Sequence, residues 1–103
     1  MGKMTEIPKS ATGQATKLDG LRGQIDAIDS AIIALLSKRM KLVKFIGKFK
    51  RAHNIAVLSP KRRNALKKMW ATRGKSLGVS PRLTQEMFEL IHKHSVALEK
   101  KTK

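Results

Sequence analysis

The amino-acid sequence predicts an all-α protein built from three helices, one long, one short and one of medium length. Its apolar residues recur at the three- and four-residue spacing of a helix, and no segment shows the alternation that is typical of strands. The dipeptide Ser-Pro occurs at residues 59–60 and 80–81, and a serine followed by proline is a typical helix start. A length of 103 residues allows one domain with a modest core.

The first helix is predicted to run from about Leu18 to Arg51 or Ala52. Alternating steps of three and four residues from Leu18 give an a/d seam. Its apolar members are Leu18, Leu21, Ile25, Ile28, Ile32, Leu35, Leu42, Ile46 and Phe49. At about 1.5 Å per residue the helix would be on the order of 50 Å long, whereas a domain of this size has a radius of gyration of about 13 Å. We therefore expect a second copy of the chain to cover part of the helix, giving a homodimer.

The remaining segments follow from local signals. We expect residues 1–16 to be a disordered basic tail, residues 17–100 to form the helical domain, and residues 101–103 to be a second disordered tail. After a linker at residues 53–58, the second helix begins at Ser59-Pro60 and ends near Gly74, and a loop at residues 75–79 follows. The third helix begins at Ser80-Pro81 and frays after Glu99.

One cation interrupts the apolar seam of the first helix. Arg39 occupies an a/d position, and a buried charge needs a counter-charge. Since residues 30–85 contain no Asp or Glu, the neighbouring chain cannot supply one, and a bound anion becomes a serious candidate. Lys50 follows on nearly the same helix face after roughly 16 Å of rise. The two side chains could bracket a small dianion, or Lys50 could be a solvated lysine near a helix end.

Other polar residues also lie beside or within apolar stripes. Arg22 flanks the seam, as does Asp29 seven residues later, which fits either an ion pair in a helix dimer or a ligand contact. Ser95 and Glu99 continue an apolar stripe of the third helix. Ser95 could allow close helix approach or offer a functional hydroxyl, and Glu99 could pair with Arg22 or Arg39. Arg62 lies in the first turn of the second helix, where a cation opposes the helix dipole.

Composition bounds the classes of function. The 23 Lys and Arg and 7 Asp and Glu give a net charge of +16, which attracts anions of any kind. Without cysteine there is no disulfide framework, and the three histidines do not form a metal-ligand set, so we expect neither a metal nor a cofactor. The sequence shows no signal peptide and no membrane span, which predicts a cytoplasmic protein without a membrane partner. Fifteen of the 23 cations lie between residues 38 and 82, but no aromatic platform or recognition helix accompanies them, so we do not expect nucleic acid as the natural partner.

Two stretches resemble the all-helical chorismate mutase family. Residues 21–29 (LRGQIDAID) and 35–39 (LLSKR) match that family's opening pattern L-R-x-x-I-x-x-I-D and L-L-x-x-R. The resemblance continues through Gly47-Lys48-Phe49-Lys50, which is similar to the G-K-x-K element, and through residues 88–91 with Ser95 and Glu99. It covers about residues 18–100. The resemblance implies an intertwined dimer of three-helix subunits and the rearrangement of chorismate to prephenate, in the biosynthesis of phenylalanine and tyrosine.

The resemblance also implies a role for each matching residue. Arg39 would bind one substrate carboxylate, and Arg22 of the second subunit would bind the other. Lys50 would hydrogen-bond the ether oxygen as the carbon–oxygen bond breaks. Arg62 and Ser95 match the arginine and the serine that support the substrate site. This pericyclic step needs no cofactor and suits a cationic pocket.

Three positions depart from the usual family pattern. Glu99 stands where glutamine is usual, and a glutamate can donate to the ether oxygen only when it is protonated, so we expect activity to be higher at mildly acidic pH. Arg63 replaces the glutamate that helps to bind the ring hydroxyl, and Ser59 replaces a nearby aspartate. Related members act on isochorismate as a pyruvate lyase or on the 4-amino analogue of chorismate, and these stay as alternatives. A non-catalytic basic binding protein is a further alternative.

Overall fold

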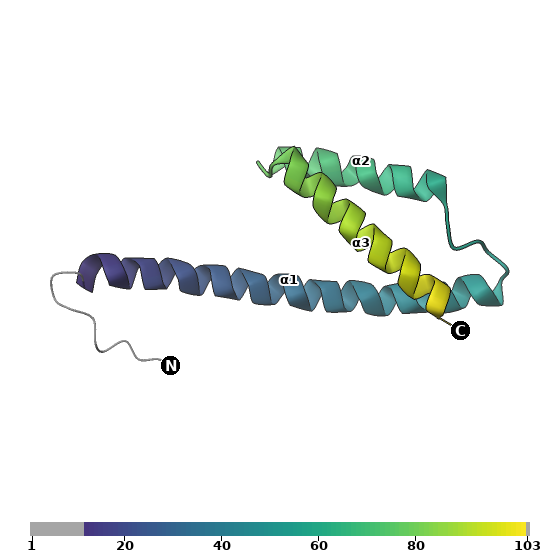
Figure 1. Ribbon diagram of the computed structural model, residues 1–103, viewed down its shortest axis with the longest axis horizontal. Coiled ribbons are helices and arrows are strands. Elements are labelled where there is room, and N and C mark those ends of the chain that lie inside the picture. Colours follow the sequence, from purple (N-terminus) through teal and green to yellow (C-terminus); the bar gives the residue numbers. More distant parts are fainter. Residues whose placement is uncertain (1–11, 103) are drawn as a thin grey trace. The chain divides into compact units, whose positions relative to one another are not determined.

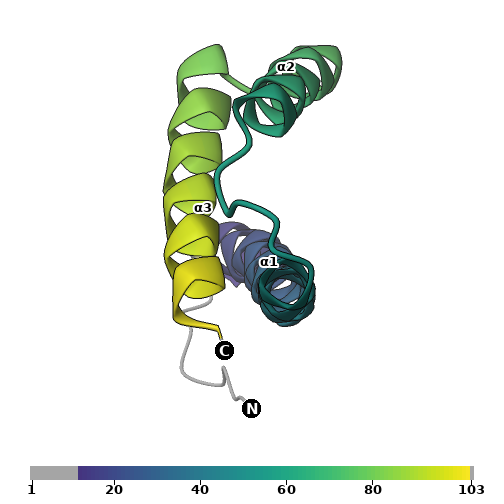
Figure 2. The ribbon, with the colours of Figure 1, turned by 90° about the vertical axis from the view of Figure 1, so that its right-hand side faces the viewer.

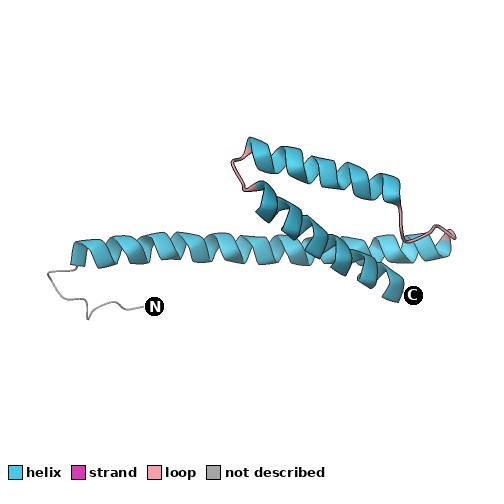
Figure 3. Ribbon diagram, turned by 45° about the horizontal axis from the view of Figure 1, so that its top comes forward, coloured by secondary structure: helices cyan, strands magenta, loops and turns pink. Residues whose placement is uncertain are grey.

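The computed structural model of this protein describes residues 12–102. It contains the helices α1 (Thr12–Ala52), α2 (Pro60–Ser76) and α3 (Pro81–Lys101), and the described residues contain no strand (Figures 1 and 3). The predicted all-α class with one long, one short and one medium helix is therefore confirmed. The described chain divides into two compact units, residues 12–37 and residues 38–102, and each is described by itself below.

Two of the predicted chain boundaries are wrong. Residues 12–16, which we assigned to a disordered tail, belong to α1. Once a long helix has formed, each added residue costs little, so a weak local preference is overridden. At the other end, Lys101 lies in α3 and Thr102 is buried, contrary to the predicted tail. Residues 1–11 and 103 lie outside the described part of the chain.

Both predicted Ser-Pro helix starts are confirmed. Ser59 Oγ accepts a hydrogen bond from the backbone N–H of Arg62 at 3.3 Å, and Ser80 Oγ accepts one from the backbone N–H of Leu83 at 3.3 Å. These bonds satisfy N–H groups that a helix leaves without partners in its first turn. The turn between α2 and α3 contains Gly78 with φ of +76°, a conformation that glycine adopts without steric strain.

The core of residues 38–102 is small and forms where α2 and α3 meet each other and the C-terminal part of α1. Its buried apolar residues are Val43, Phe88 and Ile91. The Trp70 ring on α2 contacts Phe88 at a centroid distance of 6.1 Å. Gly74 of α2 is buried against Thr84 of α3, so the two helices come closest near their connecting turn and diverge from it (Figure 1).

The C-terminal end of α3 is fixed against α1 by a close contact and a cap. A Cβ placed at Gly47 would lie 3.0 Å from Thr102 Cβ and 3.1 Å from Glu99 Cα, so a side chain here would require these neighbours to move by a few tenths of an ångström. Arg51 Nε donates to the carbonyl oxygen of Thr102 at 2.7 Å, which supplies a cation to a helix C-terminus. Figure 2 shows this end of α3 lying beside the C-terminal end of α1.

The apolar seam of α1 is exposed in the single chain. All nine of its apolar residues have exposed fractions between 44% and 63%. Most of them belong to the unit of residues 12–37. A contiguous exposed apolar surface of this kind is typical of an interaction site. The single chain does not test the predicted homodimer.

The contact between Gly74 and Thr84 gives a test of the packing. We predict that Gly74→Ala lowers the free energy of unfolding by about 1–3 kcal/mol, because the new Cβ would lie 2.5 Å from Thr84 Oγ1. This overpacking outweighs the helix propensity gained by alanine, which is about 1 kcal/mol at most. When Gly74→Ala is added to a chain that already carries Thr84→Ala, the loss of unfolding free energy should be much smaller than in the parent. Urea unfolding at fixed protein concentration measures all four chains, and a Gly74→Ala protein as stable as the parent would contradict this packing.

Candidate functional site

A cavity of about 230 Å³ lies among the C-terminal part of α1, the linker before α2, the first turns of α2 and the C-terminal half of α3. Seven of the eight residues that the sequence singled out line it. Together with His92, they are its polar residues: Arg39, Lys50, Ser59, Arg62, Arg63, Ser95 and Glu99. The eighth, Arg22, is exposed in the unit of residues 12–37 and does not line the cavity.

Arg39 is fixed by the hydroxyl group of Ser95. Arg39 Nη1 donates to Ser95 Oγ at 2.5 Å, and Ser95 Oγ donates in turn to the carbonyl oxygen of Ile91 at 2.8 Å. Ser95 is buried, so one small side chain both permits close helix approach and orients the arginine. Within residues 12–102, no carboxylate lies within 4.0 Å of Arg39. Arg39 therefore has no counter-charge among these residues, and a bound anion could supply it.

Lys50 and Glu99 form a largely buried ion pair. Lys50 Nζ lies 2.8 Å from Glu99 Oε1, and the side chains are only 19% and 12% exposed. Arg22 and Arg39 were two candidate partners for Glu99 from the sequence, and in the single chain its partner is Lys50. Lys50 Nζ also donates to the carbonyl oxygen of Val57 at 2.8 Å. An ammonium group has three N–H donors, and the bond to Val57 uses one of them, so Lys50 can still donate to a ligand.

Glu99 retains hydrogen-bonding capacity. Although Oε1 lies close to Lys50 Nζ, it receives no well-aligned hydrogen bond from the described residues, and it is buried. We regard this contact as electrostatic attraction, because the distance is short but the alignment is poor. A buried polar atom without such a partner is unusual, and a bound ligand or water can supply the missing hydrogen bond.

The first turn of α2 contributes the other wall of polar residues. Ser59 is the N-cap of α2, and its hydroxyl oxygen accepts a hydrogen bond there. The hydroxyl hydrogen can still be donated to a ligand. Arg62 is exposed and, in residues 12–102, its side chain makes no ion pair shorter than 4.0 Å. The Arg62 guanidinium thus offers an anion-binding group beside the cavity.

Arg63 has a partner that sequence reasoning missed. Its Nη2 donates to both carboxylate oxygens of Glu89, at 2.6 and 2.7 Å, and its guanidinium carbon lies 5.5 Å from the centre of the Phe88 ring. The hydrogen bond from Arg63 lowers the pKa of Glu89 below its usual value of 4.5. His92, which the sequence analysis considered only in asking about a metal site, lines the cavity. Its ring stacks on the Phe88 ring with a centroid distance of 5.6 Å.

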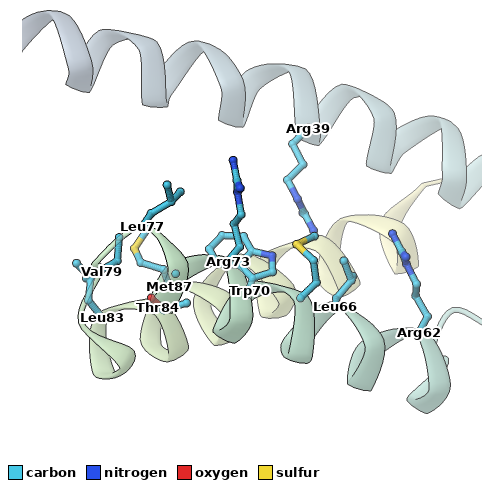
Figure 4. A pocket seen from close by; sticks show the side chains of 12 residues that line it. Arg39, Arg62, Leu66, Trp70, Arg73, Leu77, Val79, Leu83, Thr84 and Met87 are labelled. Atoms are coloured by element: carbon cyan, nitrogen blue, oxygen red, sulfur yellow. The ribbon is translucent and has the colours of Figure 1, made fainter.

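A larger groove of about 590 Å³ adjoins the cavity (Figure 4). Its lining is mainly apolar and includes Leu66, Met69, Trp70 and Leu83. Figure 4 shows Arg39 reaching into it from α1, with Arg62 and Arg73 extending from α2. Since Arg39 and Arg62 line both spaces, the groove and the cavity share two cations.

The described residues form neither a metal site nor a membrane-spanning helix. Within residues 12–102, no three His, Asp or Glu side chains come together in an arrangement that could hold a metal ion. None of the described helices combines the length and the apolar character needed to cross a membrane.

The fold and the site define a helical domain with a small, strongly cationic cavity suited to a dianion. The chain belongs to the family described as chorismate mutase type II, whose model matches residues 21–100. It is 30% identical over 83 residues to the T-protein of Enterobacter agglomerans and 30% identical over 82 residues to the T-protein of Haemophilus influenzae. These alignments cover 81% and 80% of this chain but only 22% of each T-protein, so the chain spans about a fifth of their length.

Two other proteins are similar over more of their own length. A 4-amino-4-deoxychorismate mutase from Streptomyces pristinaespiralis is 28% identical over 92 residues, which cover 86% of this chain and 71% of that protein. A conserved hypothetical protein from Pyrococcus furiosus has a similar solved structure, with a TM-score of 0.62 and 32% identity, over 82% of this chain and 96% of that one.

Proposed function

We propose that this protein is a chorismate mutase, which rearranges chorismate to prephenate in two sites shared between the subunits of a homodimer. The observation that carries this proposal is the cavity that gathers Arg39, Lys50, Ser95 and Glu99 in a chain belonging to the chorismate mutase type II family. These residues come from two helices and are far apart in the sequence. Each was expected at this site from the family pattern.

The cavity has the electrostatics that this reaction requires. The substrate carries two carboxylates, and its rearrangement breaks a carbon–oxygen bond while a carbon–carbon bond forms, without a covalent intermediate. Arg39, oriented by Ser95, would bind one carboxylate. Lys50, held in place by the carbonyl oxygen of Val57, would direct another N–H to the ether oxygen as negative charge develops there. Donors that are fixed before the reaction stabilise such charge without reorganisation.

Two features of the single chain support the proposed homodimer. The seam of α1 is exposed along its length, and burying it would remove apolar surface from water. Arg22 is exposed on the unit of residues 12–37, beside that seam. After Arg39 and Lys50, the only cations of the cavity that could bind a second carboxylate are Arg62 and Arg63. We infer that Arg22 of one subunit completes the cavity of the other.

The second candidate function is a 4-amino-4-deoxychorismate mutase. It is favoured by the similarity to the Streptomyces protein of that name. The same fold and the same cations would serve this reaction. The two functions differ in the substituent on the ring, an amino group in place of a hydroxyl group.

We predict that the purified protein converts chorismate to prephenate and that Arg39→Ala lowers kcat/KM at least about a hundredfold, because a fixed donor to the developing charge is lost. Chorismate consumption in the ultraviolet, with chromatographic identification of the product, measures this. Lys41→Ala removes an exposed cation from the same helix without touching the cavity and should leave the rate unchanged. Turnover of the 4-amino analogue alone would favour the second candidate, and turnover of neither substrate would refute the proposal.

Mixing two inactive variants tests the shared site. Arg22→Ala and Arg39→Ala should each be inactive alone, but unfolding and refolding them together should restore activity at about a quarter of the sites, since half of the dimers are mixed and each holds one intact site. Activity is measured as chorismate consumption before and after mixing. If each subunit carried a complete site, mixing would restore nothing.

We predict that activity is higher at pH 5 than at pH 8, because Glu99 can donate to the ether oxygen only as the protonated acid. An amide donates at every pH, so Glu99→Gln should show a flatter profile. His92 lines the same cavity, so His92→Gln is the control and should keep the slope of the parent. A parent profile that is flat from pH 5 to 8 would remove Glu99 from this role.

A further inference from the structure

Arg63 is held rigidly at the cavity wall by residues of α3. Its Nη2 donates to both oxygens of Glu89, at 2.6 and 2.7 Å, and its guanidinium lies over the Phe88 ring at 5.5 Å. Phe88 is buried, and the Arg63 side chain is only 33% exposed. A guanidinium fixed by both a carboxylate and an aromatic face loses little further freedom when it binds a ligand.

The attachment to Glu89 leaves donors of Arg63 available. Among residues 12–102, partners are found only for Nη2, so Nε and Nη1 can still donate. The Glu89 carboxylate does not line the cavity, and its second oxygen also lies 3.9 Å from Lys67 Nζ. The carboxylate therefore orients Arg63 from behind and does not itself face a ligand.

The charges around the cavity are strongly unbalanced. The permanent cations are Arg39, Lys50, Arg62 and Arg63, and the one carboxylate is Glu99, which already lies 2.8 Å from Lys50. No other carboxylate of residues 38–102 lines this space. A ligand with two carboxylates fits these cations, but a ligand that also carries an ammonium group would bring a fifth positive charge and find no acid to receive it.

We infer that Arg63 is a specificity-determining residue that selects a ring hydroxyl group and rejects an ammonium group at the same place, with Glu89 as its positioning residue. This inference rests on the proposed function and narrows it to chorismate over the 4-amino analogue. A hydroxyl oxygen accepts a hydrogen bond from a guanidinium N–H, whereas an ammonium group only donates. The like charges also repel each other in a partly desolvated space.

The test compares kcat/KM for chorismate with kcat/KM for 4-amino-4-deoxychorismate. The parent should prefer chorismate by about ten- to a hundredfold, the effect of one like-charge contact. Arg63→Gln should lose most of that preference, Arg63→Glu should reverse it, and Arg63→Lys should keep it, since the charge remains. Glu89→Gln should weaken the preference by releasing Arg63, and Glu89→Asp should restore part of it.

Lys67→Gln is the matched control. Lys67 lies one turn beyond Arg63 on α2 and close to the same carboxylate, but it does not line the cavity, so its loss should leave the preference unchanged. An equal preference in the parent and in Arg63→Gln would overturn the inference, as would a loss in Lys67→Gln as large as that in Arg63→Gln.

The same comparison separates this inference from the proposed function. If neither compound is turned over, the proposed function fails, and calorimetric titration of the two compounds then gives the ratio of their Kd values for each variant. A parent ratio that favours chorismate and collapses in Arg63→Gln would support the selection by Arg63 on its own. Equal Kd values for the two compounds in the parent would overturn it.

Discussion

The C-terminal unit depends on where its few carboxylates lie. Residues 38–102 contain three of them, Glu86, Glu89 and Glu99, and all three are on α3. Glu89 pairs with Arg63 and Lys67 of α2, and Glu99 pairs with Lys50 of α1. The ion pairs between helices in this unit therefore all involve α3, which links the two cationic helices that flank it. Glu86 pairs with Arg82 within α3 and makes no link between helices.

The same ion pairs hold the helices together and also position residues of the cavity wall. The Lys50–Glu99 pair joins α1 to α3 and lies in the cavity wall, and the Arg63–Glu89 pair joins α2 to α3 and orients a second wall residue. Removing one member of a buried pair leaves the other without its counter-charge, which costs more than the pair contributes. Substitutions at Lys50 or Glu99 are therefore expected to alter stability and activity together, whereas Arg39, bound to a neutral hydroxyl group, separates the two effects better.

The sequence predicted what depends on local signals. Ser59 and Ser80 mark helix starts because the capping bond joins residues three apart, and Arg39 stood out because the seam around it is regular. The helix ends were less predictable, since the C-terminal end of α3 is fixed by Arg51, which is remote in the sequence. The part played by Val57 had no signal at all, because its contribution to the site is a backbone carbonyl oxygen. Glu89 was missed because its partner lies on another helix.

Two guanidinium groups bound two spaces: Arg39 and Arg62 line both the small polar cavity and the larger apolar groove. If a second subunit fills that groove, assembly and ligand binding become thermodynamically linked, because each changes the surroundings of the same charges. Linkage is reciprocal, so a ligand that binds the dimer more tightly than the separate chains strengthens the dimer by the same factor. The apparent affinity of this protein for its ligand would then vary with its own concentration, and at low concentration the ligand would act as the agent that assembles its own site.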